Sequence, residues 1–235
     1  MLVLLFDIDG TLIHTGGAGG AALRQAFRTL FDIAEPRDVP YSGRTDRAIS
    51  RDMFTLHQVE DSPANWERLR TGYLTALAES LAACRGCVLP GISLLLEKLA
   101  THPDVAVGLL TGNLQDGARL KLQHYGLARH FAFGGYGDEH FDRDDVAVSA
   151  LAAAHQHLKG RREPRRVWVI GDTPLDIRCA RRIQAHVLAV ATGTHPRGEL
   201  ADHRPDALLN DLADVDGVLE LLMDTSSATM PPVSG

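Results

Sequence analysis

The sequence predicts an α/β protein in which a doubly wound parallel sheet carries an inserted helical segment. Short apolar runs typical of buried strands alternate with helical patterns from about residue 90 onward. Strands separated by helices of this length pair in parallel through right-handed crossovers. Residues 16–89, in contrast, contain helical patterns and no convincing strand. These two observations predict the sheet and the insertion, respectively.

The strands are expected where apolar residues run together. Residues 1–6 read Met-Leu-Val-Leu-Leu-Phe, which is typical of a strand buried on both faces. Similar runs cover residues 105–110, 167–170 and 187–190, and a weaker one covers 207–209. Apolar residues at helical spacing lie between these runs. The sheet is therefore expected to contain these five strands.

The inserted segment is expected to form a helical cap. Leu23, Ala26, Phe27 and Leu30 follow the i, i+3, i+4, i+7 spacing of one helical face. Ser62 and Pro63 are typical of a helix start, as N-cap and first helical residue. Glycines within 16–20 on one side and residues 84–91 on the other are expected to be flexible linkers, as in a lid.

These patterns divide the chain into a core domain, residues 1–15 and 90–224, and a helical cap domain, residues 16–89. The end of the chain, residues 225–235, is rich in Ser, Thr and Pro and has no aromatic residue. Such a composition favours a disordered tail.

Composition excludes several classes of partner. The 24 basic and 30 acidic residues give a formal net charge of −6, so no global field attracts nucleic acid or anionic lipid. No apolar run approaches the ~20 residues that span a bilayer. Three cysteines fit a reducing compartment, and Cys84 and Cys87 are interpreted as loop residues without an assigned role. We expect a cytoplasmic protein that binds neither nucleic acid nor membrane.

Polar residues follow three of the predicted strands. Asp7 and Asp9 follow the first, residues 111–113 (Thr-Gly-Asn) follow the second, and Asp172 and Asp176 follow the third. The carboxyl ends of parallel strands meet at one edge, where ligands bind. Two carboxylates as close as Asp7 and Asp9 require a cation, a shared proton or both. The sequence therefore predicts an acidic site at this edge.

Three motifs carry a resemblance to a known family. They are Asp7-Ile8-Asp9-Gly10-Thr11-Leu12, Leu110-Thr111-Gly112-Asn113 and Gly171-Asp172-Thr173-Pro174-Leu175-Asp176. In order and strand context they resemble the haloacid dehalogenase-like hydrolase superfamily, in the phosphoglycolate phosphatase-like branch with a helical cap. The resemblance covers nearly all of residues 1–222 and implies a Rossmann-like core.

The resemblance implies a Mg²⁺-dependent phosphatase that acts on a small phosphorylated metabolite. Asp7 would be the nucleophile that forms an aspartyl-phosphate, and Asp9 the general acid and then the general base. Asp7, Asp172 and the Asp9 main-chain carbonyl would hold the metal, and Asp176 would orient this shell or bind through water. Thr111, Gly112 and Asn113 would bind phosphoryl oxygens.

The family also uses a cation over the phosphoryl group, usually a lysine in a Lys-Pro pair. Residues 131–158 contain no lysine, and Arg143, 29 residues before Asp172, takes this place in our prediction. An arginine supplies the same charge through a planar fork. The alternative is an ordinary surface arginine flanked by aspartates.

The cap is expected to select the substrate. Arg44, in the loop of residues 42–46, is a candidate partner for a substrate carboxylate or second phosphate, and His14 is a candidate at the entrance. The alternatives are a solvated Arg44 beside a helix cap and a plain loop histidine. For the whole chain, a phosphosugar mutase of the same fold and a non-catalytic binding protein remain alternatives to the phosphatase.

Overall fold

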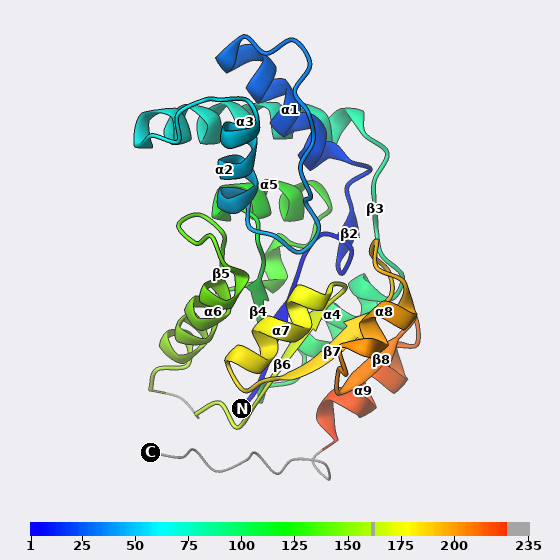
Figure 1. The fold of residues 1–235 in the computed structure, drawn as a ribbon. Helices are drawn as coiled ribbons and strands as arrows, with labels where there is room; N and C mark the ends of the chain where they lie inside the picture. The colour runs from blue at the N-terminus through cyan, green and yellow to red at the C-terminus, as the bar shows by residue number, and fades with distance from the viewer. Residues whose placement is uncertain (161–162, 225–235) are drawn as a thin grey trace.

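The computed structural model describes residues 1–160 and 163–224, and Figure 1 shows a parallel sheet below a group of helices. The six strands lie in the order β5-β4-β1-β6-β7-β8, and every pair is parallel. Their bounds are β1 Leu2–Phe6, β4 Val105–Leu110, β5 Gly134–Gly135, β6 Arg166–Gly171, β7 His186–Val190 and β8 Ala207–Leu209. The predicted α/β fold is confirmed, and β5 is an addition to the five expected strands.

The central strand β1 explains why its sequence is apolar throughout. It pairs with β4 on one side and with β6 on the other. Leu4 and Phe6 enter the apolar cluster on one face of the sheet, whereas Val3 and Leu5 enter the cluster on the other face. Both faces are buried, so no position in the strand is left for a polar side chain.

Helices cover both faces of the sheet. Helices α4 (Ile92–Ala100), α5 (Gln115–His124) and α9 (Val215–Met223) contribute to the cluster that contains Phe6. Helices α6 (Arg143–His157), α7 (Pro174–Arg182) and α8 (Arg197–Asp202) contribute to the cluster that contains Leu5. A short 3-10 helix, η1 (Ala128–His130), follows α5. The sheet is therefore doubly wound, as predicted.

The inserted helices pack around a third apolar cluster, to which Leu114 of the core also contributes. They are α1 (Ala18–Phe31), α2 (Asp46–Leu56) and α3 (Pro63–Ala83), drawn in blue to cyan at the top of Figure 1. Helix α3 begins as predicted, because the Ser62 hydroxyl accepts a hydrogen bond from the Asn65 amide and Pro63 takes the first helical position. We keep the division into a core and a cap, residues 16–89, as a proposal.

Two details of the insertion differ from the sequence prediction. Strands β2 (Ile13–His14) and β3 (Cys87–Val88) pair antiparallel, so Cys87 lies on a strand and not in a loop. Two-residue strands show no periodicity from which they could be predicted. Helix α1 already begins at Ala18, so the linker expected through Gly20 is shorter than predicted. The predicted disordered tail lies outside the described residues.

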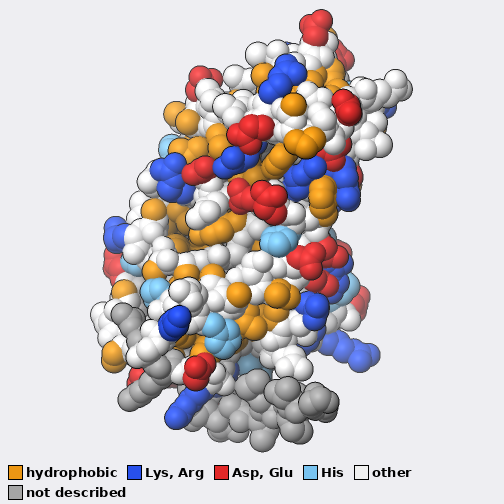
Figure 2. Space-filling model, turned by 90° about the vertical axis from the view of Figure 1, so that its left-hand side faces the viewer, with side chains coloured by type: hydrophobic (Ala, Val, Ile, Leu, Met, Phe, Trp, Pro, Cys, Tyr) orange, Lys and Arg blue, Asp and Glu red, His pale blue; other side chains and the backbone are white. Residues whose placement is uncertain are grey.

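Three properties of the described residues concern membrane-spanning helices, surface charge and free thiols. In the described ranges, none of the helices is both long and apolar enough to cross a membrane. On the face shown in Figure 2, acidic and basic side chains are intermixed over the helical end. Cys84, Cys87 and Cys179 are free thiols.

Candidate active site

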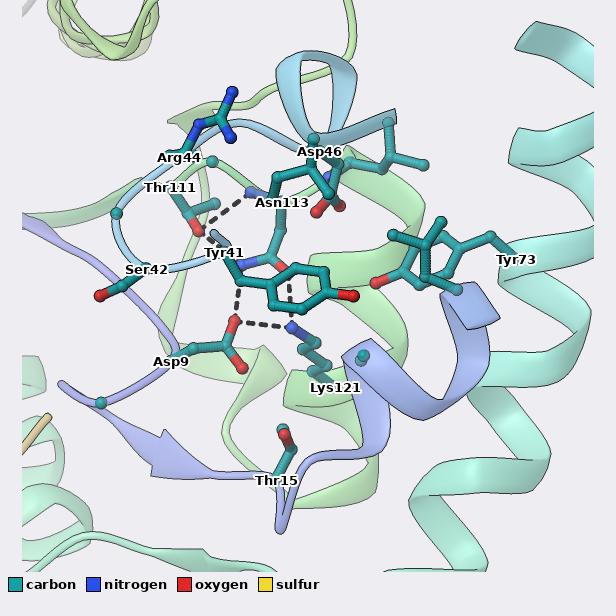
Figure 3. A pocket seen from close by; sticks show the side chains of 18 of the residues that line it. Asp9, Thr15, Tyr41, Ser42, Arg44, Asp46, Tyr73, Thr111, Asn113 and Lys121 are labelled. Carbon is teal, nitrogen blue, oxygen red and sulfur yellow. Dashed lines mark hydrogen bonds and ion pairs between the residues drawn. The ribbon is translucent and has the colours of Figure 1, made fainter. Parts of the chain in front are cut away.

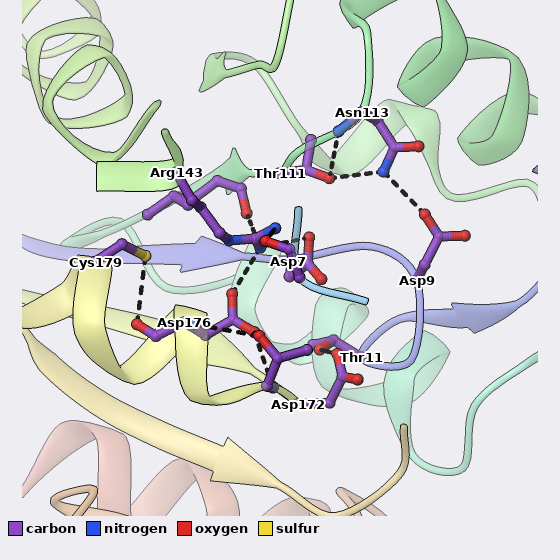
Figure 4. Close-up of polar contacts among 12 residues, drawn as sticks. Asp7, Asp9, Thr11, Thr111, Asn113, Arg143, Asp172, Asp176 and Cys179 are labelled. Atoms are coloured by element: carbon purple, nitrogen blue, oxygen red, sulfur yellow. Dashed lines mark hydrogen bonds and ion pairs between the residues drawn. The ribbon is translucent and has the colours of Figure 1, made fainter. Parts of the chain in front are cut away.

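The acidic and polar residues predicted at the sheet edge do converge. Figure 4 shows Asp7, Asp9, Asp172 and Asp176 around the carboxyl ends of β1 and β6, with Thr111 and Asn113 following β4. Above them lies a pocket of about 440 Å³, lined both by core residues and by residues of α1, α2 and α3. The pocket therefore lies where the inserted helices meet the sheet.

Three buried carboxyl groups form the floor of the site. One oxygen atom each of Asp7, Asp172 and Asp176 lies within 4.8 Å of the others. The Thr11 hydroxyl donates to Asp172 Oδ1 at 2.9 Å. Gly10 has φ of 85°, and a Cβ atom there would overlap with the Asp172 carboxylate. The glycine of the first motif is thus required by both backbone conformation and space.

Arg143 lies beside this carboxylate cluster. It is the first residue of α6 and is 3% exposed. Its Nη2 lies 2.9 Å from Asp7 Oδ1 and donates to Asp176 Oδ1 at 2.6 Å. Nη1 donates to the main-chain carbonyl of Gly43 at 3.1 Å. Its burial contradicts the interpretation of Arg143 as a surface residue.

Burial shapes the charges of the cluster. It raises the pKa of Asp7 to about 6, although Arg143 acts in the opposite direction. Burial, and then the neighbouring Asp7 and Asp176, also raise the pKa of Asp172 well above its usual value. Three carboxylates beside one guanidinium carry an excess of two negative charges when all are ionised. Oxygen ligands with this excess fit a hard divalent cation.

Asp176 is held by the start of helix α7. Its Oδ2 accepts hydrogen bonds from the Thr173 amide at 3.0 Å and hydroxyl at 2.8 Å, and the Thr173 hydroxyl accepts one from the Asp176 amide at 3.3 Å. This reciprocal arrangement is a capping box, with Pro174 at the first helical position. Because Oδ1 accepts from Arg143, both Asp176 oxygens have donors. The residue is placed to orient the cluster.

The loop after β4 carries the predicted phosphoryl-binding residues. Thr111 is fully buried, and its hydroxyl oxygen accepts hydrogen bonds from the amide and the side-chain Nδ2 of Asn113, at 3.3 and 2.7 Å. The Gly112 carbonyl accepts from the Asp46 amide of the cap at 2.7 Å. A Cβ atom on Gly112 would overlap with the carbonyl of Arg44. The glycine therefore permits close approach of residues 41–46, which we call the cap loop.

Lys121 is a site residue that the sequence analysis missed. Figure 3 shows its Nζ between Asp9 and Asn113, donating to Asp9 Oδ2 and to Asn113 Oδ1 at 2.6 Å each. Asn113 Nδ2 also donates to Asp9 Oδ2, at 2.9 Å. A signal was present: Lys121 shares a helical face with the buried Ala118 and Leu122, where an apolar residue is expected.

The two predicted substrate contacts have different positions. His14 is exposed on β2 and lines the pocket. Arg44 also lines the pocket, but its guanidinium group donates to Asp52 at 2.6 Å and to the Pro40 carbonyl at 3.1 Å, both within the inserted segment. Its charge is therefore already compensated by Asp52.

The loop before α2 is attached to the core at further points. Asp46 Oδ2 accepts a hydrogen bond from the Leu114 amide at 2.8 Å. The Ser42 hydroxyl lies 3.2 Å from the Thr194 hydroxyl and 3.1 Å from His195 Nε2. Burial raises the pKa of Asp46 to about 6, with Lys121 acting against this rise. In this structure the cap loop is thus closed over the sheet edge.

The fold and the buried carboxylates define an α/β enzyme that works at the carboxyl edge of a parallel sheet. The chain belongs to the haloacid dehalogenase-like hydrolase family, whose model matches residues 4–190. This confirms the resemblance inferred from the three motifs. It also makes the protein a hydrolase of that family.

Individual relatives agree with this assignment. The phosphoglycolate phosphatase of Synechococcus elongatus is 26% identical over 220 residues, which cover 92% of this chain and 95% of the relative. Among solved structures, a hydrolase from Pseudomonas syringae has a TM-score of 0.70 at 20% identity, covering 95% of this chain and all of the other. CbbY from Rhodobacter sphaeroides, in complex with phosphate, has a TM-score of 0.69 at 19% identity, covering 91% and 95%. At these identities the solved structures support the fold.

Proposed function

We propose that the protein is a Mg²⁺-dependent phosphatase that hydrolyses a small phosphomonoester through an aspartyl-phosphate on Asp7. The observation that carries this proposal is the Asp7 carboxylate on the pocket floor, with the Arg143 guanidinium 2.9 Å away. The relative named phosphoglycolate phosphatase supports a small phosphorylated substrate. The free thiols fit a reducing compartment, so we retain the cytoplasm as the proposed location.

In the first step, a carboxylate oxygen of Asp7 attacks the phosphorus atom. The bond from phosphorus to the ester oxygen breaks, its electron pair goes to that oxygen, and Asp9 supplies the proton that completes the leaving alcohol. Arg143 and the loop of residues 111–113 offset the charge on the transferring group. Within the described residues, the Gly112 amide donates to no other group, which leaves it for a phosphoryl oxygen.

In the second step, Asp9 takes a proton from water, and the water oxygen attacks the phosphorus atom of the aspartyl-phosphate. The bond between phosphorus and Asp7 breaks, which restores the carboxylate and releases inorganic phosphate. Asp9 is held for both steps, since Lys121 and Asn113 both donate to its Oδ2. A fixed carboxyl group avoids the entropy cost of positioning it in each step.

The carboxylates of Asp7 and Asp172, with the main-chain carbonyl of Asp9, would hold Mg²⁺ in this enzyme. The ion supplies charge compensation for the phosphoryl group and keeps Asp7 ionised. Asp176 would orient the ligands through its capping box and through Arg143.

The test is inorganic phosphate release from a panel of phosphomonoesters, with Mg²⁺ or with a chelator. We expect metal-dependent turnover by the wild-type protein, on which an aspartyl-phosphate can be trapped. Asp7→Asn should abolish this turnover. Asp32→Asn is the matched control: Asp32 caps α1 in the left-handed conformation, which Asn also adopts readily. Unchanged turnover in Asp7→Asn would refute the mechanism, and isomerised product without released phosphate would identify the mutase.

A further inference from the structure

We propose that Ser42, His195 and Glu199 form a second catalytic site, which hydrolyses carboxylic esters with a short acyl chain. The three side chains form one hydrogen-bonded chain outside the carboxylate cluster. The Ser42 hydroxyl lies 3.1 Å from His195 Nε2, and His195 Nδ1 lies 2.9 Å from Glu199 Oε1. A hydroxyl, an imidazole and a carboxylate in this order are the parts of a serine hydrolase site, whatever fold carries them. This activity needs neither Mg²⁺ nor Asp7, so it does not depend on the proposed phosphatase.

Glu199 determines which nitrogen atom of His195 carries the proton. A carboxylate only accepts hydrogen bonds, so the proton of the neutral imidazole lies on Nδ1 and the lone pair on Nε2. Nε2 is therefore the acceptor for the Ser42 hydroxyl, as a general base requires. Glu199 lies in the first turn of α8 and His195 two residues before that helix, so local structure forms this pair.

The position of Ser42 suits a nucleophile. The residue is exposed in a turn in which the Arg44 amide donates to the Tyr41 carbonyl at 3.1 Å, and the next residue, Gly43, has φ of 69°. Ser42 lines the pocket, and Figure 3 shows its hydroxyl pointing away from Asp9. An ester therefore reaches this hydroxyl without occupying the phosphatase site.

Unused donors lie next to this nucleophile. In the part of the chain that the structure describes, the amides of Ser42 and Gly43 donate to no acceptor. In acyl transfer, main-chain amides at and beside the nucleophile bind the oxygen atom that gains negative charge. Gly193 and Thr194 also line the pocket, and the Thr194 hydroxyl lies 3.2 Å from that of Ser42. Because these neighbours are small or polar, we expect a short acyl chain.

The reaction follows the steps of acyl transfer. The Ser42 oxygen bonds to the carbonyl carbon, and its proton moves to His195 Nε2. The bond from that carbon to the alcohol oxygen then breaks, and His195 gives the proton to the leaving oxygen. A water molecule next attacks the acyl group on Ser42 and gives a proton to His195. Release of the carboxylic acid returns this proton to the Ser42 oxygen.

Another serine–histidine pair lacks the carboxylate and provides the matched control. His140 Nε2 lies 2.9 Å from the Ser149 hydroxyl. Among residues 1–160 and 163–224, no hydrogen bond or ion pair joins a carboxylate to His140. Its tautomer is therefore not fixed, and Ser149 has no oriented base. We expect reaction at Ser42 and none at Ser149.

The first experiment uses a biotin-linked fluorophosphonate, whose phosphorus atom bonds to an activated serine oxygen with loss of fluoride. Peptide mass spectrometry should place the adduct on Ser42. His195→Ala should reduce the labelling rate by about 100-fold and Glu199→Gln, which keeps the shape of the side chain, by about tenfold. Ser149→Ala should label like the wild type. Absence of an adduct on Ser42 would overturn the proposal and leave these contacts as an attachment of the cap loop.

Ester hydrolysis separates this site from the phosphatase. Hydrolysis of p-nitrophenyl acetate is followed with Mg²⁺ and with a chelator. The wild-type rate should not change with the chelator, since no metal takes part, and Ser42→Ala should reduce kcat/KM by about 100-fold. Ser149→Ala is again the control. Ester turnover that the chelator removes, or that persists in Ser42→Ala, would contradict the assignment, whether or not the protein releases phosphate from phosphomonoesters.

Discussion

The guanidinium group of Arg143 donates a hydrogen bond to the main-chain carbonyl of Gly43 at 3.1 Å. Gly43 belongs to the cap loop, whereas the other Nη of Arg143 contacts Asp7 and Asp176 in the core. One planar group therefore joins the closed cap loop to the proposed nucleophile. Because the fork is rigid, movement of the loop changes the most favourable position of the cation beside Asp7.

Substitution of Arg143 should affect stability and activity together. Arg143→Met leaves Asp7 and Asp176 buried without a counter-ion, which should lower the free energy of unfolding by about 3–5 kcal/mol and abolish turnover. Arg143→Lys keeps the charge but cannot reach Asp7, Asp176 and the main-chain carbonyls of Gly43 and Leu110 together, so it should restore part of the stability and little activity. Thermal unfolding and phosphate release measure the two effects. Arg178→Met removes two exposed ion pairs between α7 and Asp142 and Asp144; it is the control and should change neither strongly.

Closure of the cap loop should depend on Gly112. In Gly112→Ala the new methyl group overlaps with the Arg44 carbonyl, so residues 41–46 must move away from the core. Displacement of this loop by about 1 Å should reduce kcat/KM by about 100-fold. Gly198→Ala is the matched control, since its Cβ atom meets nothing within 4 Å. An unchanged kcat/KM in Gly112→Ala would show that activity does not depend on the observed position of residues 41–46.

The carboxyl group of Asp46 should make stability depend on pH. Burial raises its pKa from 3.8 to about 6, so the folded protein holds this proton more tightly than the unfolded chain. The contribution of Asp46 to stability is therefore greatest at a pH below the unfolded-state pKa. It declines as the pH rises from the unfolded-state pKa to the folded-state pKa, and it stays low at higher pH. At a pH close to the unfolded-state pKa, Asp46→Asn and the wild type should have the same melting temperature. At pH ~7, Asp46→Asn should have the higher melting temperature. A difference in melting temperature that does not vary with pH would contradict this.

Mg²⁺ should stabilise the protein through Asp172. A cation that binds only the folded state raises the free energy of unfolding, by about 2.7 kcal/mol at 100 times its Kd. Asp172→Asn removes one of three crowded carboxylates, so without metal it should be more stable than the wild type, and Mg²⁺ should shift its melting temperature less. The Asn side-chain oxygen can still accept the Thr11 hydrogen bond. Equal metal shifts in both proteins would place the ion elsewhere.

Gly117 should be replaceable with a gain in stability. It lies within α5, where glycine costs about 1 kcal/mol relative to alanine. A Cβ atom there would meet its nearest neighbours, in Leu114, Leu77 and Tyr73, at 3.7 Å, which is ordinary van der Waals distance. Gly117→Ala should therefore unfold at higher denaturant concentration. Gly135→Ala provides the contrast, because its Cβ atom would collide with the main chain of α6, and this variant should be destabilised.

Strong local signals made most of the fold predictable. The unbroken apolar run of β1 and the Ser62-Pro63 helix start each depend on neighbouring residues in the sequence. The carboxylates of Asp7 and Asp172 could be placed together because parallel strands end at one edge. In contrast, β5 is the dipeptide Gly134–Gly135, which has no side-chain pattern and is defined only by its pairing with β4.

The site was less predictable where its contacts join distant residues. Lys121 reaches Asp9 across 112 residues of sequence, and nothing near either residue specifies this contact. Arg44 was a candidate partner for the substrate, and it lines the pocket, but the sequence did not show that Asp52 pairs with its guanidinium group. A sequence motif shows which groups are present at a site. It does not show which of their charges are already compensated.

The pairing of β2 with β3 has a consequence for how the inserted segment can change. Ile13 lies opposite Val88 and His14 opposite Cys87, so the chain leaves the sheet-bearing part and returns to it at adjacent positions. Neighbouring strands are ~5 Å apart, a gap that a two-residue hairpin turn also closes. The whole segment between them can therefore be exchanged for another without rerouting any strand of the sheet. The topology therefore allows the inserted segment to change while the strands that carry the buried carboxylates keep their order.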